Sequence, residues 1–290
     1  METSELLKKV RKIEIKTRGL TSHIFSGQYH SAFKGRGMAF SEVREYQFGD
    51  DIRSIDWNVT ARFNHPFVKI FEEERELTVM LLIDVSGSNE FGTQKQLKSQ
   101  LMTEIAGVLS FSAIYNNDKV GVIFFSNKIE KFIPPQKGTV HILRIIRELI
   151  NFKPENKETN ISEALRYLTN IIKKRCIAFV ISDFIDNNFQ ESFKIANKKH
   201  DVIAIHLFDE RETYLPKVGI IKLKDAESGK SILVDTSNIL TRNFFAKQWN
   251  EKTENFKTQF TKNGIDLVSI STDQDYIKPL ISLFKRRELR

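Results

Sequence analysis

A carboxylate and two hydroxyls stand on alternate positions where an apolar run of the chain ends. Residues 81–92 read LLIDVSGSNEFG, so Asp84, Ser86 and Ser88 directly follow the apolar residues. Side chains of this kind can cap the next helix, serve as a nucleophile with its helpers, or hold a metal ion. The rest of the sequence has to decide among these three roles.

Two further oxygen-bearing side chains stand in comparable places. Asp183 follows the apolar run 177–181, and Thr159 directly precedes Asn160, which is placed to cap a helix from residue 161. A capping Asn160 leaves the Thr159 hydroxyl available for another partner. Carboxylates and hydroxyls are oxygen ligands that suit Mg²⁺, and Mn²⁺ or Ca²⁺ would accept similar ligands. One such motif alone would favour a capped turn, but three loops together favour a metal site.

The positions of these loops depend on the elements between them. From residue 79 onward, short apolar runs without polar alternation are separated by helical patterns, which is typical of strands buried in a parallel sheet. The apolar runs are 79–83, 120–125, 177–181, 202–208 and 265–270. This alternation predicts an α/β fold with an open, doubly wound, mostly parallel sheet and helices on both faces. Ligands of such sheets bind at the carboxyl ends of the strands, where Asp84 and Asp183 stand.

Helices and a hairpin are predicted around these strands. The face of the first helix after Asp84 is formed by apolar residues at helical spacing. These residues are Leu97, Leu101, Ile105, Val108 and Leu109. Residues 218–235 read as a hairpin around Ser228 and Gly229, because two β-prone runs flank a polar turn. A long helix is predicted over about 238–262, and the chain ends in another over 276–287.

The first 77 residues lack the strand–helix alternation, so we expect residues 1–77 and 78–290 to form separate parts. A charged helix over about 4–16 and a small β-rich segment are predicted in the first part. Arginines alternate there with acids, and bidentate guanidinium–carboxylate pairs could hold an irregular segment in place. The residues are Arg44, Arg53 and Arg62 with Glu45, Asp50, Asp51 and Asp56. Trp57 is the expected apolar anchor of the segment.

Composition limits the class of protein. No stretch approaches the length of a membrane span, the N-terminus has no apolar signal segment, and the single Cys176 permits no internal disulfide. A cytoplasmic protein is therefore expected. The net charge of +8 arises mostly from residues 128–200, with 14 cations against 8 anions. These cations are spread out and do not interleave with aromatic residues, so nucleic-acid binding ranks below a solubilising surface or an acidic partner.

Fewer residues of the sequence support an enzyme active site than support a metal-binding site. A phosphatase of the Asp-x-Asp type needs an acid where Ser86 stands, and no glycine-rich phosphate-binding loop is present. A serine nucleophile needs a histidine base, and no histidine stands in a pairing motif; His206, inside an apolar run, is expected in the core. A Mg²⁺-dependent phosphohydrolase or nuclease using Asp84 and Asp183 remains the enzymatic alternative, although two-metal chemistry generally uses more carboxylates.

The set of oxygen ligands resembles the metal-ion-dependent adhesion site of von Willebrand factor A domains. The resemblance implies a Rossmann-like von Willebrand A fold in which the hydroxyls of Ser86, Ser88 and Thr159 ligate Mg²⁺. It further implies that Asp84 and Asp183 act directly or through water, and that a partner's carboxylate completes the metal's coordination. Such a site makes a contact and catalyses no reaction.

A longer resemblance comes from the segment before the motif. The phrase GRGMAFSEVREYQFGDDIRSIDWNVTAR and the run from Pro66 to Ser88 are similar to the bacterial family called domain of unknown function 58. The phrase DAESGKSILVDTS (225–237) is also similar to it. The resemblance implies partnership with MoxR-type AAA+ ATPases and with other von Willebrand A proteins. We therefore expect a non-enzymatic, Mg²⁺-dependent protein–protein interaction module, with no membrane span.

Overall fold

The computed structural model describes Tyr29 and residues 39–72, 76–92, 96–186, 189–225 and 229–289. The charged helix expected over about 4–16 lies outside these residues. Contacts divide the chain into two compact units, of which the smaller is Phe33–Leu77 and the larger includes Thr78–Arg290. Each unit is described by itself below.

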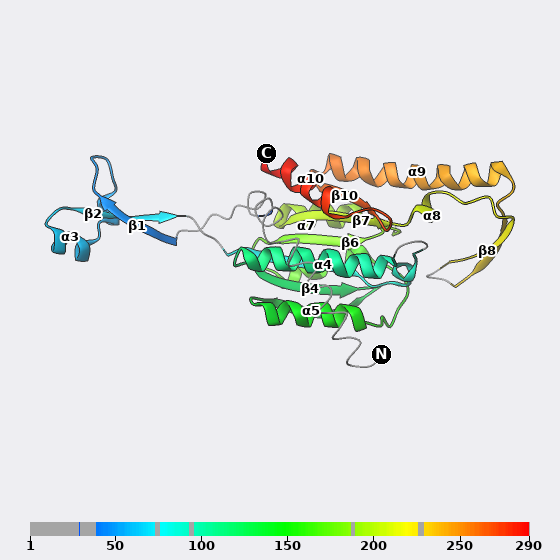
Figure 1. Cartoon of the computed structure of the whole chain (residues 1–290), viewed down its shortest axis with the longest axis horizontal. Helices are drawn as coiled ribbons and strands as arrows, with labels where there is room; N and C mark the ends of the chain where they lie inside the picture. The colour runs from blue at the N-terminus through cyan, green and yellow to red at the C-terminus, as the bar shows by residue number, and fades with distance from the viewer. Residues whose placement is uncertain are drawn as a thin grey trace. The chain divides into compact units, whose positions relative to one another are not determined.

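A six-stranded sheet forms the centre of the larger unit (Figure 1). Its strands are β3 (Thr78–Asp84), β4 (Lys119–Phe125), β5 (Ile129–Gln136), β6 (Ile177–Ser182), β7 (Asp201–Phe208) and β10 (Asp266–Ser271). The spatial order is β10-β7-β6-β3-β4-β5, and every neighbouring pair is parallel except β4 and β5. All five apolar runs are strands, so the predicted mostly parallel α/β sheet is confirmed.

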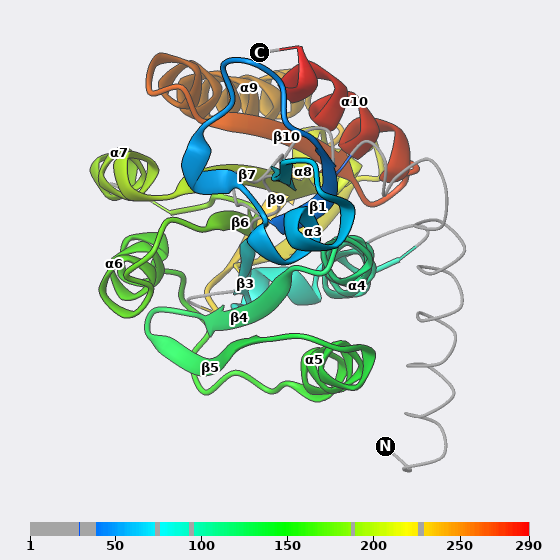
Figure 2. The ribbon, with the colours of Figure 1, turned by 90° about the vertical axis from the view of Figure 1, so that its left-hand side faces the viewer.

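Helices cover both faces of this sheet, as the end-on view in Figure 2 shows. On one side lie α4 (Lys98–Tyr115), α5 (Thr139–Asn151) and α10 (Ile277–Glu288). On the other lie α6 (Ile161–Ile171), α7 (Gln190–Lys199) and α9 (Ile239–Lys262). The second layer buries a large apolar core that joins strand residues such as Met80 and Val180 to Leu165, Phe193 and Phe260 of the helices. Burial of these faces supplies the main driving force for the fold.

The order of the strands places a switch point between β3 and β6. The chain passes from β3 to β4 and β5 on one side, and returns through β6, β7 and β10 on the other. The loops that follow β3 and β6 therefore leave the sheet side by side and diverge toward opposite faces. Such a divergence opens a crevice at the carboxyl ends of the strands, which is where open α/β sheets bind ligands.

The edge strand β5 was not expected from the sequence. It contains Pro134 and Pro135, and proline is confined to edges and bulges of sheets because it cannot donate a ladder hydrogen bond. Val120 pairs with Gln136 and Val122 with Ile133, so both prolines oppose the single residue Gly121 in a β-bulge. A Cβ atom at Gly121 would lie 2.8 Å from the Met80 sulfur and 2.9 Å from the Pro135 nitrogen. Only glycine lets β5 approach this closely.

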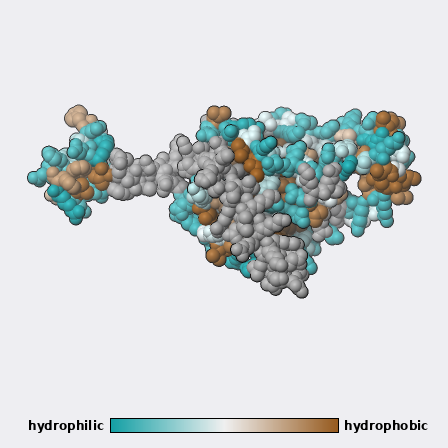
Figure 3. Space-filling view, viewed as in Figure 1, coloured by the Kyte–Doolittle hydropathy of each residue, from teal (hydrophilic) through white to brown (hydrophobic). Residues whose placement is uncertain are grey.

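The predicted hairpin and the long helix that follows it are confirmed. Strands β8 (Ile220–Lys224) and β9 (Ser231–Asp235) pair antiparallel, and the Asn238 side chain caps α9 by accepting from the Leu240 amide. The short helix α8 (Glu210–Thr213) precedes the hairpin. Figure 3 shows apolar surface over the hairpin and the start of α9, where Leu233 is 75% and Leu240 73% exposed.

The smaller unit pairs β1 (Ala39–Glu45) with β2 (Phe67–Glu72), antiparallel, around η2 (Ile52–Ser54) and α3 (Trp57–Phe63). One expected ion pair is confirmed, because both Arg44 guanidinium nitrogens bond to the Asp50 carboxylate at 2.7 and 2.8 Å. Asp56 instead caps α3 and lies 3.5 Å from the Lys69 ammonium. Trp57 is 67% exposed, so the expectation that it anchors this segment is wrong for the unit taken by itself.

No helix in the described ranges combines the length and the apolar character needed to cross a membrane.

Replacing Gly121 with valine is expected to lower the free energy of unfolding by about 1–3 kcal/mol, because added methyl groups would press against Met80 and the β5 backbone. Urea denaturation measures the change. Ser231→Val, at an exposed position of β9, is the control and should stay within about 0.5 kcal/mol of the parent. An equal response of the two variants would contradict the close packing at the bulge.

Candidate metal centre

The loop after β3 is held by hydrogen bonds to its own acid. The carboxylate of Asp84, which is fully buried, accepts from the Ser86 amide at 3.0 Å. The Ser86 and Ser88 hydroxyls lie 3.1 Å apart, and the short helix η3 (Gly87–Glu90) begins between them. The Asn89 amide nitrogen donates to the Asp84 carbonyl oxygen at 3.0 Å, which closes the turn. The alternate spacing of these side chains thus brings their oxygens onto one side of one loop.

The loop after β6 brings the second acid to the same place. The Asp183 carboxylate is buried, the Ser88 hydroxyl helps to lower its pKa, and its Oδ1 accepts from the Ile185 amide at 3.2 Å. Ser182, the last residue of β6, donates its hydroxyl to Asp84 Oδ2 at 2.6 Å. The two loops at the switch point are therefore joined through side-chain oxygens.

The pKa values of the two carboxyl groups shift in opposite directions because, among the described residues, only Asp183 has a cation beside it. Burial raises the pKa of Asp84 to about 7, and the charge of Asp183 adds to this rise. Burial alone would also raise the pKa of Asp183, but the Lys98 ammonium outweighs it and holds that pKa below its usual value. An uncompensated carboxylate at Asp84 is the group that a further cation would stabilise most.

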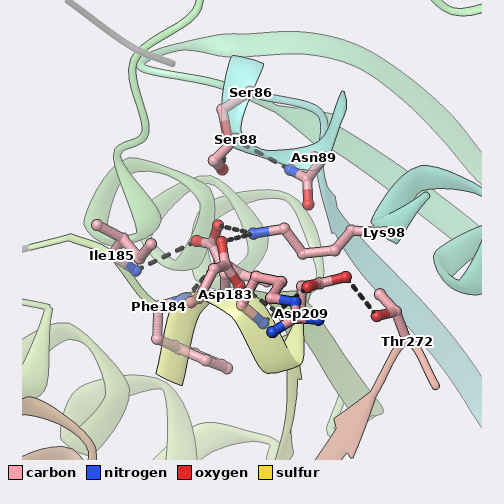
Figure 4. A network of polar contacts seen from close by, with 12 residues as sticks. Ser86, Ser88, Asn89, Lys98, Asp183, Phe184, Ile185, Asp209 and Thr272 are labelled. Atoms are coloured by element: carbon pink, nitrogen blue, oxygen red, sulfur yellow. Dashed lines mark hydrogen bonds and ion pairs between the residues drawn. The ribbon is translucent and has the colours of Figure 1, made fainter. Parts of the chain in front are cut away.

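The cation is Lys98, at the first position of α4 and with a fully buried side chain. Its ammonium lies 2.8 Å from Asp183 Oδ2 and 2.8 Å from Glu212 Oε1, as the close view in Figure 4 shows for Asp183. Burial would lower the pKa of Lys98, but these two carboxylates raise it above its usual value. Lys98 is therefore a permanent positive charge inside the centre.

Two outer loops hold Glu212 in position. Asp209 caps α8, and its backbone amide donates to Glu212 Oε2 at 2.8 Å in a capping box. Asp209 Oδ1 accepts from the Arg211 amide, and Asp209 Oδ2 accepts from the Thr272 hydroxyl at 2.7 Å. Thr272 directly follows β10 (Figure 4). Four strand ends, those of β3, β6, β7 and β10, thus contribute to one polar network.

Thr159 stands on a loop that borders this network. The Gly87 amide donates to the Lys157 carbonyl oxygen at 3.0 Å, and the Asn160 amide donates to Ser126 at 2.9 Å. Asn160 caps α6 as expected, because its side chain accepts from the Glu163 amide at 3.0 Å. Thr159 is half-buried, and its loop touches the serine loop through backbone atoms. The structure thus gathers Asp84, Ser86, Ser88 and Asp183 at the ends of β3 and β6, with Thr159 on the adjoining loop.

The composition of the centre can be tested against the needs of Mg²⁺. In the part of the chain that is described, no group of three or more His, Cys, Asp or Glu side chains could hold a metal. A metal here would therefore use the two carboxylates with serine hydroxyls and water, which is a hard-oxygen set that Mg²⁺ accepts. The Asn89 side-chain oxygen is buried and has no hydrogen-bond partner, so one acceptor beside the serines is left for a bound water. These residues fit the ion.

The sequence carries a signal for the burial of one member of the network, Lys98. Lys98 stands three and seven residues before Leu101 and Ile105, so it begins the buried face of α4. Leu97, which we placed on that face, is instead 38% exposed and precedes the helix. Asn89 and Ser182 flank the predicted ligands, but nothing in their spacing marks them.

His206 lies in the core, as the sequence indicated. Its ring is 1% exposed, stacks on Phe208 at 5.3 Å and lies beside Trp249 and Phe256. Burial lowers its pKa to about 3, so the imidazole is neutral at physiological pH.

Proteins with similar sequences occur in bacteria. Uncharacterized protein Rv1480 of Mycobacterium tuberculosis is 27% identical over 292 residues, which cover 99% of this chain and 91% of that protein. Uncharacterized protein YeaD of Bacillus subtilis is 28% identical over 122 residues, or 42% of this chain and 27% of that protein.

Solved structures with the same fold include the conserved hypothetical protein BatB from Bacteroides thetaiotaomicron. It is 17% identical in sequence, covers 74% of this chain and 100% of its own, and superimposes with a TM-score of 0.50. This likeness supports the α/β fold alone. A family model described as "Protein of unknown function DUF58" matches residues 42–255, and the chain therefore belongs to the DUF58 family.

Proposed function

We propose that the protein is a non-enzymatic, Mg²⁺-dependent protein–protein interaction module. The observation that carries this proposal is the convergence of Asp84, Ser86, Ser88 and Asp183 at the switch point of the sheet, linked through their own oxygens. With Thr159 from the adjoining loop, they form the ligand set of a von Willebrand A-like adhesion site. The metal would present an open coordination position to an acidic side chain of the partner.

Charge balance supports such a site. Asp84 and Asp183 are both buried, and the two ion pairs of Lys98 are made with Asp183 and Glu212, so the Asp84 carboxylate is not paired with this ammonium. A divalent ion held by Asp84 and the serine hydroxyls would neutralise the remaining carboxylate. Coulomb attraction is strong where water is excluded, so the ion would be held by few protein ligands.

The surroundings of the serines favour binding over chemistry. Ser86 contacts Ser88 and Asp84, and Ser88 contacts Asp183, so each hydroxyl is paired with oxygen groups and not with an imidazole base. A nucleophilic serine requires such a base to accept its proton. The phosphohydrolase and nuclease alternatives would have to rely on metal-activated water instead.

For the partner we propose a MoxR-type AAA+ ATPase, on the basis of the resemblance in residues 26–88. Other von Willebrand A proteins are the second candidates. The module would act as an adaptor whose contact with the ATPase depends on the bound ion and on an acidic side chain of the ATPase.

Wild-type protein is expected to bind one Mg²⁺ ion in isothermal titration calorimetry, and Asp84→Asn is expected to lose at least tenfold in affinity. Asparagine keeps the shape of the side chain but removes the charge that the ion would neutralise. Glu254→Gln, at an exposed position of α9, is the control and should bind as the wild type does. Absent binding, or equal affinities for all three proteins, would reject the metal site.

An activity screen with the same proteins separates binding from catalysis. The non-enzymatic proposal expects no Mg²⁺-dependent turnover of phosphate esters or nucleic acids. Turnover that the wild type shows and Asp84→Asn loses would instead establish the enzymatic alternative.

Replacing Lys98 with methionine is expected to weaken the fold and strengthen the metal site. Loss of the ammonium leaves Asp183 and Glu212 buried without their cation, which should cost about 3–5 kcal/mol of unfolding free energy. Mg²⁺ should then bind more tightly, because a competing positive charge is gone. Urea denaturation with and without Mg²⁺ measures both effects. Lys247→Met, an exposed α9 variant, is the control, and weaker Mg²⁺ binding by Lys98→Met would contradict the electrostatic account.

A purified MoxR-type ATPase from the same genome is expected to bind the wild-type chain in the presence of Mg²⁺. Binding should disappear when the metal is chelated and when Asp84→Asn replaces the wild type, because the contact requires the ion. Surface plasmon resonance with the intact chain measures the interaction. Binding that survives both changes would remove the metal site from this partnership.

A further inference from the structure

A cavity of about 410 Å³ opens beside the candidate centre and shares two of its residues. Asp84 and Ser86 line the cavity at one end, together with Asn89. The remaining wall is formed by Ser99 and by apolar residues, namely Val85, Leu97, Met102, Leu149, Ile150, Phe152 and Pro154. A lining that combines apolar side chains with polar groups suits a ligand that carries both, and the volume lies in the usual range for ligand pockets.

The fold explains why apolar residues gather here. The beginning of α4 and the end of α5 both lie at the carboxyl end of the parallel strands. Helix α4 follows β3 and starts at that end, whereas α5 follows the antiparallel strand β5, starts at the opposite end and runs toward it. The two helices pack through Phe111, Ile142 and Ile146 farther along their lengths. Near Leu97 and Leu149 they leave the cavity between them, directly beside the serine loop.

The segment that includes α5 and the loop after it carries more cations than acids. Residues 139–157 carry four cations, Arg144, Arg147, Lys153 and Lys157, against the two acids Glu148 and Glu155. Both acids are already paired, Glu148 with Lys131 at 2.7 Å and Glu155 with Lys128. An excess of cations in this segment favours the approach of a ligand that carries negative charge.

We propose that this cavity holds a large apolar side chain of the partner, next to the acidic side chain that completes the metal's coordination. The preferred ligand is thus a peptide segment in which Asp or Glu stands beside an aromatic or long aliphatic residue. The inference rests on the proposed metal-dependent function and adds the sequence preference of the partner. The carboxylate supplies attraction to the ion, and the apolar neighbour supplies burial in the cavity.

Four capped dipeptides provide the probes: acetyl-Phe-Glu-amide, acetyl-Glu-Phe-amide and the two in which Gly replaces Phe. Amide chemical-shift titrations with Mg²⁺ present should show that at least one phenylalanine peptide binds tenfold or more tightly than its glycine counterpart, because it buries an aromatic ring. Acetyl-Phe-Gln-amide and acetyl-Gln-Phe-amide, which lack the carboxylate, should bind at least tenfold more weakly than the corresponding Glu peptides.

Variants of α5 assign the preference to the cavity. Leu149→Trp fills the cavity and should abolish the tenfold preference while leaving Mg²⁺ affinity unchanged. Val140→Trp, on the same helix but 83% exposed and away from the cavity, should keep it. If Leu149→Trp does not fold, Ile150→Ser, which makes the wall polar, should reduce the preference instead.

The outcomes separate this inference from the proposed function. Protein that binds no Mg²⁺ defeats the proposed function itself. Protein that binds Mg²⁺ but takes phenylalanine and glycine peptides equally, or keeps the preference in the Leu149→Trp and Ile150→Ser variants, overturns the cavity assignment alone.

Discussion

The structure depends on how two buried carboxylates tolerate each other at the switch point of the sheet. Asp84 and Asp183 follow adjacent strands, so the fold itself brings their charges together where little water can screen them. Hydrogen bonds from Ser182 and the serine loop reduce this repulsion, and Lys98 removes much of what remains. The raised pKa of Asp84 and the lowered pKa of Asp183 are two results of one unequal compensation.

This constraint reaches beyond the two acids. Lys98 needs a second carboxylate, and Glu212 provides it only because the Asp209 capping box orients α8. Asp209 is fixed in turn by Thr272, at the far side of the sheet. Removing any member would leave a buried charge or a buried polar atom without its partner, which is costly in a region of low dielectric. The polar network therefore depends on the order of the strands, because that order brings the ends of β3, β6, β7 and β10 together.

Elements and site residues could be predicted from the sequence where a local pattern of residue types marks them. Uninterrupted apolar runs mark the five parallel strands because those strands are buried on both faces. The edge strand β5 escaped notice because its prolines and charged residues are tolerated only at a bulged edge, which no local pattern reveals. Asp84, Ser86, Ser88 and Asp183 were recognisable because strand ends imply a common location. Lys98 was not, since its role depends on an acid 85 residues away along the chain. For Trp57 the prediction was wrong in the other direction, because its large apolar ring suggested burial and the side chain is exposed.

The buried ammonium of Lys98 has a consequence for the life of the protein in the cell. Many small metal-binding domains collapse when their ion is withdrawn, because the ion supplies the only counter-charge. Here the chain has an internal counter-charge for one of its two acids, on a side chain that cannot diffuse away. The newly synthesised chain can therefore fold its sheet without a bound ion, whatever the concentration of divalent cations. An ion that binds at Asp84 as proposed would then join and leave a chain that is already folded.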